Sequence, residues 1–232
     1  PEQIGLVHRA HIKQLARERI LAAGRNIDDA KRPQYFIANG KKYAIVSATQ
    51  IERSYTYTKP ADETSGGVLK CLDPAEFIDA IRTADKNADY GLAMVHWGTE
   101  GNENFGADQK SLAQKFADAG ADVIIGGHTH CLQGVDMIDD TPVYYSLGNF
   151  WFTTSMNMPA DYDSAIAKVV IAKSGDISAN LLYCRFHNGV TSLITDEEKC
   201  EAIYNKYSNL SGDAVLKDGM IVSKFTNEAF SK

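Results

Sequence analysis

The sequence has 232 residues, of which 44% are hydrophobic and 23% are charged, and its formal net charge is −6. This composition excludes a largely disordered chain, because it supplies enough apolar surface to build a packed core. The negative charge argues against a nucleic-acid partner, which normally requires a basic patch or stripe, and no run approaches the roughly 18 apolar residues of a membrane span.

The N-terminal part of the sequence predicts a helix. Apolar side chains recur near helical spacing over residues 4–23, and Gly24 is a suitable helix stop. The chain starts abruptly inside this helix, without the basic and apolar segments of a signal peptide. We therefore expect the sequence to be a trimmed or processed piece of a longer protein.

A β-hairpin is predicted next. The β-rich runs 35–38 and 43–46 are separated by a segment that begins with Asn39 and Gly40. Both residue types tolerate positive φ, and this pair is the strongest short signal for a tight hairpin. Residues 52–70 are polar and contain glycine, which predicts a surface loop.

The centre of the chain shows the order helix, strand, helix, strand. The segment 73–76, Asp-Pro-Ala-Glu, is typical of a helix start with Asp73 as its cap. Apolar strands are expected at 91–95 and 122–125, with a helix at 108–119 between them. A connection through one helix makes the two strands parallel, almost always with a right-handed crossover. Both strands then end at one edge of the sheet, where ligands of open α/β sheets bind.

The C-terminal part of the sequence predicts further strands and one helix. A strand is expected at 143–147, and the alternating runs 165–172 and 177–186 predict a hairpin across a Ser-Gly-Asp turn. A capping box at 195–198 predicts a helix that ends near residue 207.

Three histidines follow the two parallel strands. His96 comes directly after the first strand, while His128 and His130 follow the second, behind Gly126 and Gly127. Because the strands share an edge, we expect the three imidazoles to converge, and the i, i+2 spacing in an extended segment lets two rings point the same way. The glycines allow the backbone to approach a bound ion or phosphate. Neutral imidazole suits zinc, iron and, less strongly, manganese, so we predict a metal site; a hydrogen-bonded histidine cluster without metal is the alternative.

The four cysteines do not form a recognisable metal or redox motif. They are Cys71, Cys131, Cys184 and Cys200, and no two of them have C-x-x-C spacing. Buried or free thiols are the favoured interpretation, with one or two disulfides as the alternative for an exported protein. Cys131 follows His130 directly and is therefore an alternative soft metal ligand.

Residues 94–100 and 119–130 closely resemble the CapA family of bacterial capsule (poly-γ-glutamate) synthesis proteins, within the calcineurin-like metallophosphoesterase fold. Residues 145–150, Tyr-Ser-Leu-Gly-Asn-Phe, match the next signature of that family, and positions between 23 and 40 match its helix-to-hairpin stretch. The resemblance runs from about residue 4 to 150 and is specific when its motifs are taken together.

The resemblance implies an α/β fold, a metallophosphoesterase-like sandwich of two sheets flanked by helices in four layers. Residues 1–190 are expected to be the C-terminal part of this domain, whose N-terminal strands are missing from the sequence. Residues 191–232 are expected to form a C-terminal helical extension packed on the same domain.

The resemblance also implies roles for individual residues. The metal ligands carry over onto His96, His128 and His130. Glu100 matches an acidic residue of the family, and it or His128 is expected to move a proton in catalysis. Trp97, Gly127 and Asn149 are expected to face the substrate or to support the ligands. For Trp97 a packing role, and for Asn149 a turn cap, are the alternatives.

One departure from the family pattern limits what this chain can do alone. The fold normally supplies aspartates and an asparagine–histidine pair from earlier strands, and these motifs are absent from the sequence. Three histidines can hold one zinc with an open position, but a two-metal centre must be clamped from both sides. We expect a divalent transition metal (zinc, manganese or iron), dinuclear in the full-length protein, and a chain that is weakly active or inactive by itself.

The expected function is metal-dependent hydrolysis of a phosphoester or amide, acting on or with an anionic polymer. We expect the protein at the extracellular face of the membrane or as a secreted protein. The expected partners are this polymer or a phosphoester substrate and other capsule-synthesis membrane proteins, without nucleic acid. A non-catalytic scaffold in a polymer synthesis or export complex and a general metallophosphoesterase are the alternatives. A homodimer through an exposed sheet edge is a further hypothesis.

Overall fold

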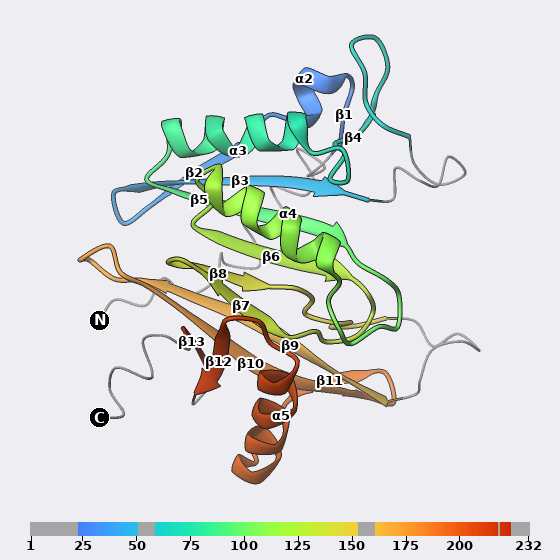
Figure 1. The fold of residues 1–232 in the computed structure, drawn as a ribbon, viewed down its shortest axis with the longest axis vertical. Coiled ribbons are helices and arrows are strands. Elements are labelled where there is room, and N and C mark those ends of the chain that lie inside the picture. Colours follow the sequence, from blue (N-terminus) through green and yellow to red (C-terminus); the bar gives the residue numbers. More distant parts are fainter. Residues whose placement is uncertain (1–22, 51–58, 153–160, 218, 224–232) are drawn as a thin grey trace. The chain divides into compact units, whose positions relative to one another are not determined.

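The computed structural model describes residues 23–50, 59–152, 161–217 and 219–223 (Figure 1). The helix expected over residues 4–23 lies outside the described residues, apart from its last position. The chain divides into two compact units. We call residues 4–97 and 107–126 the N-terminal unit, and residues 98–106 and 127–232 the C-terminal unit.

The N-terminal unit is a sheet with two main helices. Its elements in chain order are β1 (Ala23–Gly24), α2 (Ile27–Ala30), β2 (Gln34–Ala38), β3 (Lys41–Thr49), β4 (Gly67–Val68), α3 (Ala75–Asn87), β5 (Tyr90–Trp97), α4 (Ala107–Asp118) and β6 (Val123–His128), whose last two residues belong to the C-terminal unit. The strand order in the sheet is β2-β3-β5-β6. The short strands β1 and β4 pair with each other. β4 lies within residues 52–70, which were expected to form a loop.

The predicted hairpin is confirmed. Strands β2 and β3 pair antiparallel, with Ala38 opposite Lys41. Asn39 and Gly40 between them have φ angles of 49° and 74°. Both central residues therefore occupy the left-handed region that a two-residue turn of this kind requires.

The predicted parallel arrangement of β5 and β6 is supported by hydrogen bonds where the strands begin. The Asp122 backbone N–H donates to the Gly91 carbonyl oxygen over 2.9 Å, and the Gly91 N–H donates to Asp122 Oδ2 over 2.6 Å. Since both residues stand at the start of their strands, β5 and β6 run in the same direction. β3 also pairs parallel with β5, with Thr49 opposite His96.

Helices α3 and α4 bury their apolar faces in the core of the N-terminal unit. Phe77 on α3 and Phe116 on α4 are fully buried and meet edge to face, with ring centroids 4.9 Å apart. The expected start of α3 was wrong in detail. Its N-cap is Pro74, without a side-chain hydrogen bond, because Asp73 instead accepts from Lys70 Nζ over 2.6 Å.

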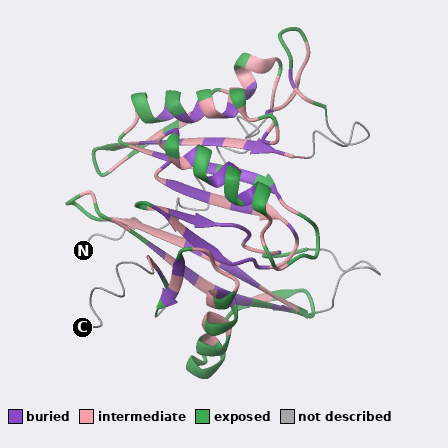
Figure 2. Cartoon of the chain, in the orientation of Figure 1, coloured by how far each residue is buried: buried purple, intermediate pink, exposed green. Residues whose placement is uncertain are grey.

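The C-terminal unit is mostly antiparallel. Its elements are β7 (Val135–Ile138), β8 (Thr141–Tyr144), β9 (Asp161–Ile171), β10 (Ile177–His187), β11 (Val190–Leu193), α5 (Glu197–Asn209), β12 (Ala214–Lys217) and β13 (Met220–Ser223). β7 and β8 form a hairpin, and β10 pairs with β9 along its whole length and also with β11 and β13. The predicted β9–β10 hairpin is therefore confirmed. Figure 2 shows buried residues along the strands of both units.

The sequence prediction missed several strands of this unit. β7 was not predicted, and the strand expected at 143–147 is β8, which ends at Tyr144. Residues 191–232, expected to be a helical extension, contain α5 and also the β12–β13 hairpin. α5 begins as predicted after Asp196, whose side chain accepts from the Lys199 backbone N–H.

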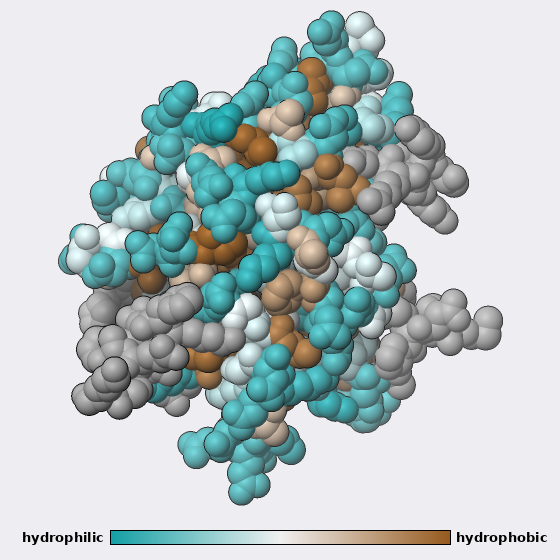
Figure 3. Space-filling model, in the orientation of Figure 1, coloured by the Kyte–Doolittle hydropathy of each residue, from teal (hydrophilic) through white to brown (hydrophobic). Residues whose placement is uncertain are grey.

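The described residues include no helix that is long and apolar enough to cross a membrane. The face shown in Figure 3 is mostly hydrophilic, and its apolar side chains appear in small groups. The chain thus has a mixed α/β fold with several sheets and helices.

Candidate functional site

Two of the three predicted histidine ligands lie in the segment 128–131, which we call the histidine loop. The backbone of this loop is not extended as expected, because His128 has a φ of 102° and His130 a φ of 61°. Residues other than glycine rarely occupy this region, and such conformations gather at functional sites. The two rings still lie close together, with centroids 6.3 Å apart and planes at 51°.

A buried threonine fixes the histidine loop between its two histidines. Thr129 is 0% exposed, and its Oγ1 lies 2.9 Å from the Cys131 carbonyl oxygen and 2.8 Å from Ser146 Oγ. Its own carbonyl oxygen accepts from the Gly101 backbone N–H over 2.8 Å. The loop is therefore tied both to the segment that follows β8 and to the loop 98–106.

Asn149 orients the ring of His130. The two side chains meet at 2.9 Å between His130 Nδ1 and Asn149 Oδ1. With an amide oxygen facing it, Nδ1 carries the proton, so Nε2 keeps the lone pair that a metal or an incoming proton requires. The ring of Phe152 packs edge-on against the same imidazole at 4.9 Å, which further restricts its rotation.

Asn149 also has an unused donor. Its Nδ2 is buried and has no hydrogen-bond partner among the described residues. A buried polar atom of this kind is costly unless a partner arrives. The free N–H group is therefore a candidate contact for an added ligand.

Gly148 explains how Asn149 reaches His130. Its φ is 69°, and a Cβ at this position would lie 3.2 Å from both the Asp163 carbonyl oxygen and the Leu132 backbone nitrogen. A larger residue would be strained in this conformation and crowded by backbone. The Gly-Asn pair of the 145–150 signature therefore serves the geometry of the histidine loop.

His128 lies in a partly buried environment next to Glu100. Burial lowers the pKa of His128, the exposed Glu100 carboxylate opposes this change, and His130 reinforces it. The balance favours the neutral imidazole, which is the form that binds a metal.

Gln133 positions the loop that carries Glu100, and the sequence analysis missed it. Gln133 is 2% exposed, and its Nε2 donates to the carbonyl oxygens of Asn102 and Asn104 over 2.9 and 3.2 Å. The only sequence signal was a polar residue within an otherwise apolar stretch, which does not reveal a partner some thirty positions earlier.

Gly127 has open space beside it. A Cβ built on this residue would meet no atom within 4 Å. Packing therefore does not demand glycine here, and the space next to His128 can admit another group. The approach of a ligand to the backbone at Gly127 stays a prediction.

His96 and Trp97 belong to the N-terminal unit. His96 is exposed near the end of β5, and its carbonyl oxygen accepts from the Gln50 backbone N–H over 2.9 Å. Its convergence on His128 and His130 stays a prediction. Trp97 is 0% exposed and stacks on Phe116 with ring centroids 6.0 Å apart, so it is a core packing residue and not a wall of the site.

The described residues include no group of three His, Cys, Asp or Glu side chains placed to hold a metal ion. The histidine loop alone offers two imidazoles, one fewer than the usual protein ligands of catalytic zinc. Cys131 is not part of any such group of three among the described residues, and burial raises the pKa of its thiol in the absence of metal. A metal site at the histidine loop therefore stays a prediction, to which the orientation of His130, the unpartnered Asn149 Nδ2 and the space at Gly127 are relevant.

The remaining cysteines give no sign of a redox site. All four cysteines lie in the described part of the chain, where no disulfide bond joins them, and Cys71 and Cys184 are buried. Burial raises the pKa of the Cys184 thiol, which therefore stays protonated.

The region of this chain that matches known proteins includes the whole candidate site. The model of the family "Bacterial capsule synthesis protein PGA_cap" matches residues 7–154. The "PGA biosynthesis protein CapA" of Bacillus subtilis (strain 168) is 34% identical over 157 residues, which are 67% of this chain and 40% of the relative. The "Capsule biosynthesis protein CapA" of Bacillus anthracis is 27% identical over 200 residues, which are 84% of this chain and 47% of the relative. The chain thus spans less than half of the length of both relatives.

A solved structure is also similar. It is the crystal structure of a hypothetical protein from Thermus thermophilus, with a TM-score of 0.41 and 15% sequence identity over 65% of this chain and 61% of that one.

Proposed function

The chain belongs to the family of bacterial capsule synthesis proteins PGA_cap, and on this premise we propose that its histidine loop is part of a metal-dependent hydrolytic site. The observation that carries this proposal is the contact of His130 Nδ1 with Asn149 Oδ1, which directs the opposite ring nitrogen away from the protein amide. Histidine ligands of metals almost always have such a partner on the second nitrogen. A metallophosphoesterase-like fold is part of the same proposal.

We expect a divalent transition ion, namely zinc, manganese or iron, to be held by His128 and His130 with His96 as the third ligand. When bound, such an ion would lower the pKa of a water molecule to about 7 and polarise the attacked ester or amide group. A dinuclear centre in the full-length protein would need further ligands from sequence outside this chain.

The protein groups have separate tasks in this scheme. Asn149 holds the ring of His130 through its Oδ1, and its buried Nδ2 can donate to a substrate oxygen. Glu100 places a carboxylate in the surroundings of His128, where it can accept a proton. Gly127 leaves the space in which the substrate approaches His128.

The proposed substrate is a phosphoester or an amide of an anionic polymer, and the proposed place of action is the cell surface. Support for the polymer comes from the capsule and PGA biosynthesis proteins that the chain resembles. Other capsule-synthesis proteins would then be its partners. The alternative of a non-catalytic scaffold is distinguished by the following experiment.

The chain is first freed of metal and then supplied with zinc or manganese. In this form we expect it to hydrolyse a chromogenic phosphodiester or a γ-glutamyl amide slowly. Activity should require the ion and fall at least about a hundredfold in His128→Ala, because a ligand is lost. Hydrolysis that persists in metal-free protein or in His128→Ala would contradict the proposal. Metal binding without any hydrolysis, also in a longer version of the protein, would support the scaffold.

Asn149→Ala is expected to weaken metal affinity by about 10–100-fold, because the ring of His130 loses its orienting partner. Asn149→Asp should retain most of the affinity, since a carboxylate also accepts from Nδ1. Asn180→Ala is a suitable control on β10 in the same unit. Isothermal titration with zinc would measure all four proteins, and equal affinity of Asn149→Ala and wild type would contradict the orienting role.

A further inference from the structure

Three exposed aromatic residues follow Asn149 directly, and we call residues 150–152, Phe-Trp-Phe, the aromatic segment. The exposed fraction is 48% for Phe150, 61% for Trp151 and 39% for Phe152. Large apolar side chains that gather on a surface mark places where a protein binds something else. The aromatic segment is therefore a candidate contact for a ligand.

The backbone of the aromatic segment is fixed by two hydrogen bonds. The Phe152 N–H donates to the Tyr162 hydroxyl over 2.9 Å, and the Phe150 carbonyl oxygen accepts from Thr191 Oγ1. Tyr162 is itself stacked on the buried Phe186, with ring centroids 4.5 Å apart. The three aromatic side chains are thus exposed on a backbone that is tied to β9 and β11. Groups that are held in place in this way lose little freedom when they bind a ligand.

One hydrogen bond fixes the indole of Trp151 and also uses its polar group. Nε1 donates to the Gly189 carbonyl oxygen over 3.2 Å, at the turn between β10 and β11. Because an indole has no other donor and no acceptor, the exposed part of Trp151 offers a ligand only its apolar ring surface. The ring faces carry the negative side of the quadrupole, which attracts C–H groups and the flat faces of other rings.

The aromatic segment adjoins the candidate site. Asn149 and Phe152 both contact the ring of His130, at 2.9 Å between Oδ1 and Nδ1 and at 4.9 Å between ring centroids. The chain from 149 to 152 therefore curves around His130, with Phe150 and Trp151 between the two contacts. A substrate that binds at His130 and extends along this segment reaches the indole of Trp151.

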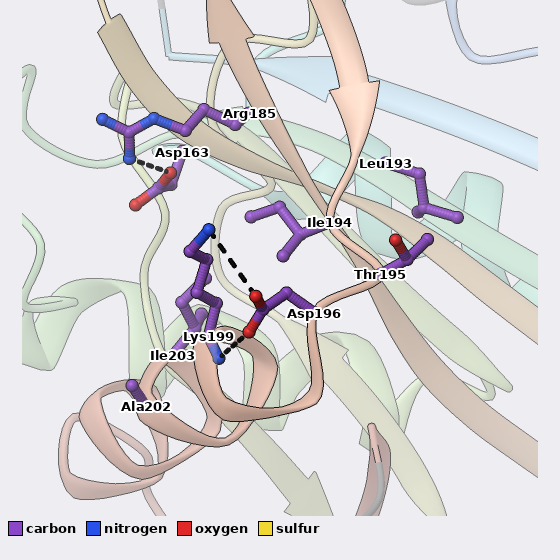
Figure 4. Close-up of a pocket in the computed structure, with 9 residues that line it drawn as sticks. All are labelled: Asp163, Arg185, Leu193, Ile194, Thr195, Asp196, Lys199, Ala202 and Ile203. Atoms are coloured by element: carbon purple, nitrogen blue, oxygen red, sulfur yellow. Dashed lines mark hydrogen bonds and ion pairs between the residues drawn. The ribbon is translucent and has the colours of Figure 1, made fainter.

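The surroundings of the aromatic segment are uncharged or balanced in charge. The sequence contains no charged residue between Asp140 and Asp161. At the neighbouring end of β10, His187 is paired with Asp161 over 2.5 Å. Arg185 donates to Asp163 over 2.9 Å, as Figure 4 shows. Each of these basic side chains has a carboxylate beside it, so this end of the sheet has no excess of positive charge, and an uncharged group fits the indole better than an anionic one.

We propose that Trp151 is a substrate-binding residue of the proposed hydrolytic site and stacks on an uncharged ring of the substrate. The ring belongs to the alcohol that is esterified to the phosphate, so the substrate class is a ring-bearing phosphoester. The phosphoester bond in this assignment rests on the proposed function of the histidine loop. One face of a pyranose sugar consists of C–H groups and a nucleobase has a flat π face, so both rings can stack on an indole.

Tryptophan fluorescence of the whole metal-free chain tests the stacking. The sequence has two tryptophans, and Trp97 is fully buried, so a ligand at the surface changes the emission of Trp151. Glucosyl methyl phosphate should change this emission and bind at least about tenfold more tightly than dimethyl phosphate, which carries the same charge without a ring. Tighter binding of thymidine 5′-methyl phosphate than of the glucosyl ester identifies a nucleobase as the ring; otherwise the ring is a sugar.

Three results of these titrations would overturn the assignment. The first is equal binding of dimethyl phosphate and the two ring-bearing esters. The second is an unchanged emission with both ring-bearing esters. The third is a blue shift with phosphatidylcholine vesicles while the esters have no effect, which would identify the aromatic segment as a membrane contact.

Variants locate the binding, with affinities measured from amide chemical shifts. Trp151→Ala should lower the affinity for the preferred ring-bearing ester at least about fivefold, whereas Trp151→Phe keeps a flat ring and should lose less. Ile37→Ala is the matched control, because it removes a 75% exposed apolar side chain from the N-terminal unit. Full affinity in Trp151→Ala, or an equal loss in Ile37→Ala, would contradict the role of the indole.

Binding and hydrolysis are measured separately, so that each can fail alone. Ring-dependent binding without metal-dependent hydrolysis of the same ester would reject the hydrolytic function and leave the ring contact of Trp151. Metal-dependent hydrolysis that is equally fast in wild type and Trp151→Ala, without ring-dependent binding, would keep the function and reject the role of Trp151.

Discussion

Replacement of His128 or His130 by alanine is expected to lower the affinity for zinc or manganese by at least about a hundredfold, because even the loss of a partner behind a ligand costs 10–100-fold. The two rings lie 6.3 Å apart between centroids. The buried Thr129 fixes the loop that carries them, and the 2.9 Å contact with Asn149 Oδ1 holds the ring of His130. Each alanine would remove one of the proposed ligands from a loop that the protein holds in place, so rearrangement should recover little of the affinity.

The same titration tests whether His96 joins the pair. His96→Ala should weaken binding as much as His128→Ala if the three imidazoles converge. His187→Ala is the control, because this exposed histidine pairs with Asp161 over 2.5 Å at the end of β10. Competition with a chromophoric chelator measures the affinities. Unchanged affinity in both histidine-loop variants would remove the metal hypothesis, whereas loss there but not in His96→Ala would remove only the third ligand.

Elements with strong local signals were predictable from the sequence. The Asn39-Gly40 turn specifies its hairpin through residues that accept positive φ. The buried face of α4, with Leu112 and Phe116, follows from helical spacing. The β9–β10 hairpin follows from alternation around a glycine-containing turn. In each of these cases the information lies within a few residues of the element that it determines.

The contacts that shape the candidate site were not predictable in this way. His130 and Asn149 are 19 positions apart, and the folded strands bring them together. Gln133 reaches back to Asn102 across 31 positions. The positive φ of His128 also contradicts the extended backbone that its sequence position suggested, since tertiary bonds to Thr129 and not local preference set the loop. Motif spacing indicated which residues to consider but not how they are held.

Asp136→Ala is expected to destabilise the chain by at least about 3 kcal/mol, because a donor left unsatisfied in the interior costs about 1–3 kcal/mol. Asp136 is 0% exposed on β7 and accepts three hydrogen bonds. The donors are the backbone N–H groups of Met137 and Asp213, over 3.0 and 2.5 Å, and the Tyr145 hydroxyl, over 3.2 Å. Alanine would leave all three without this acceptor.

The Asp136 carboxylate also connects the core to the histidine loop. Burial and the negative charge of Asp136 raise the pKa of Tyr145, which therefore stays a protonated donor. The Tyr145 ring stacks on Phe105 with centroids 3.8 Å apart, and the next residue, Ser146, holds Thr129. Loss of the carboxylate should thus loosen the loop 98–106 and the histidine loop together.

Two further variants separate the hydrogen bonds from the mere presence of a side chain. Asp136→Asn keeps one oxygen for the two backbone donors, which both bind Oδ1, and should cost only about 1 kcal/mol. Asp140→Ala, in the exposed β7–β8 turn, should change stability by less than about 0.5 kcal/mol. Urea unfolding followed by circular dichroism measures the three differences. If Asp136→Ala proved as mild as Asp140→Ala, the donors would have found other partners and the carboxylate would not organise this unit. We predict that the stability of Asp136→Ala lies far below the stabilities of Asp136→Asn and Asp140→Ala. This order follows only if the three donors depend on Asp136.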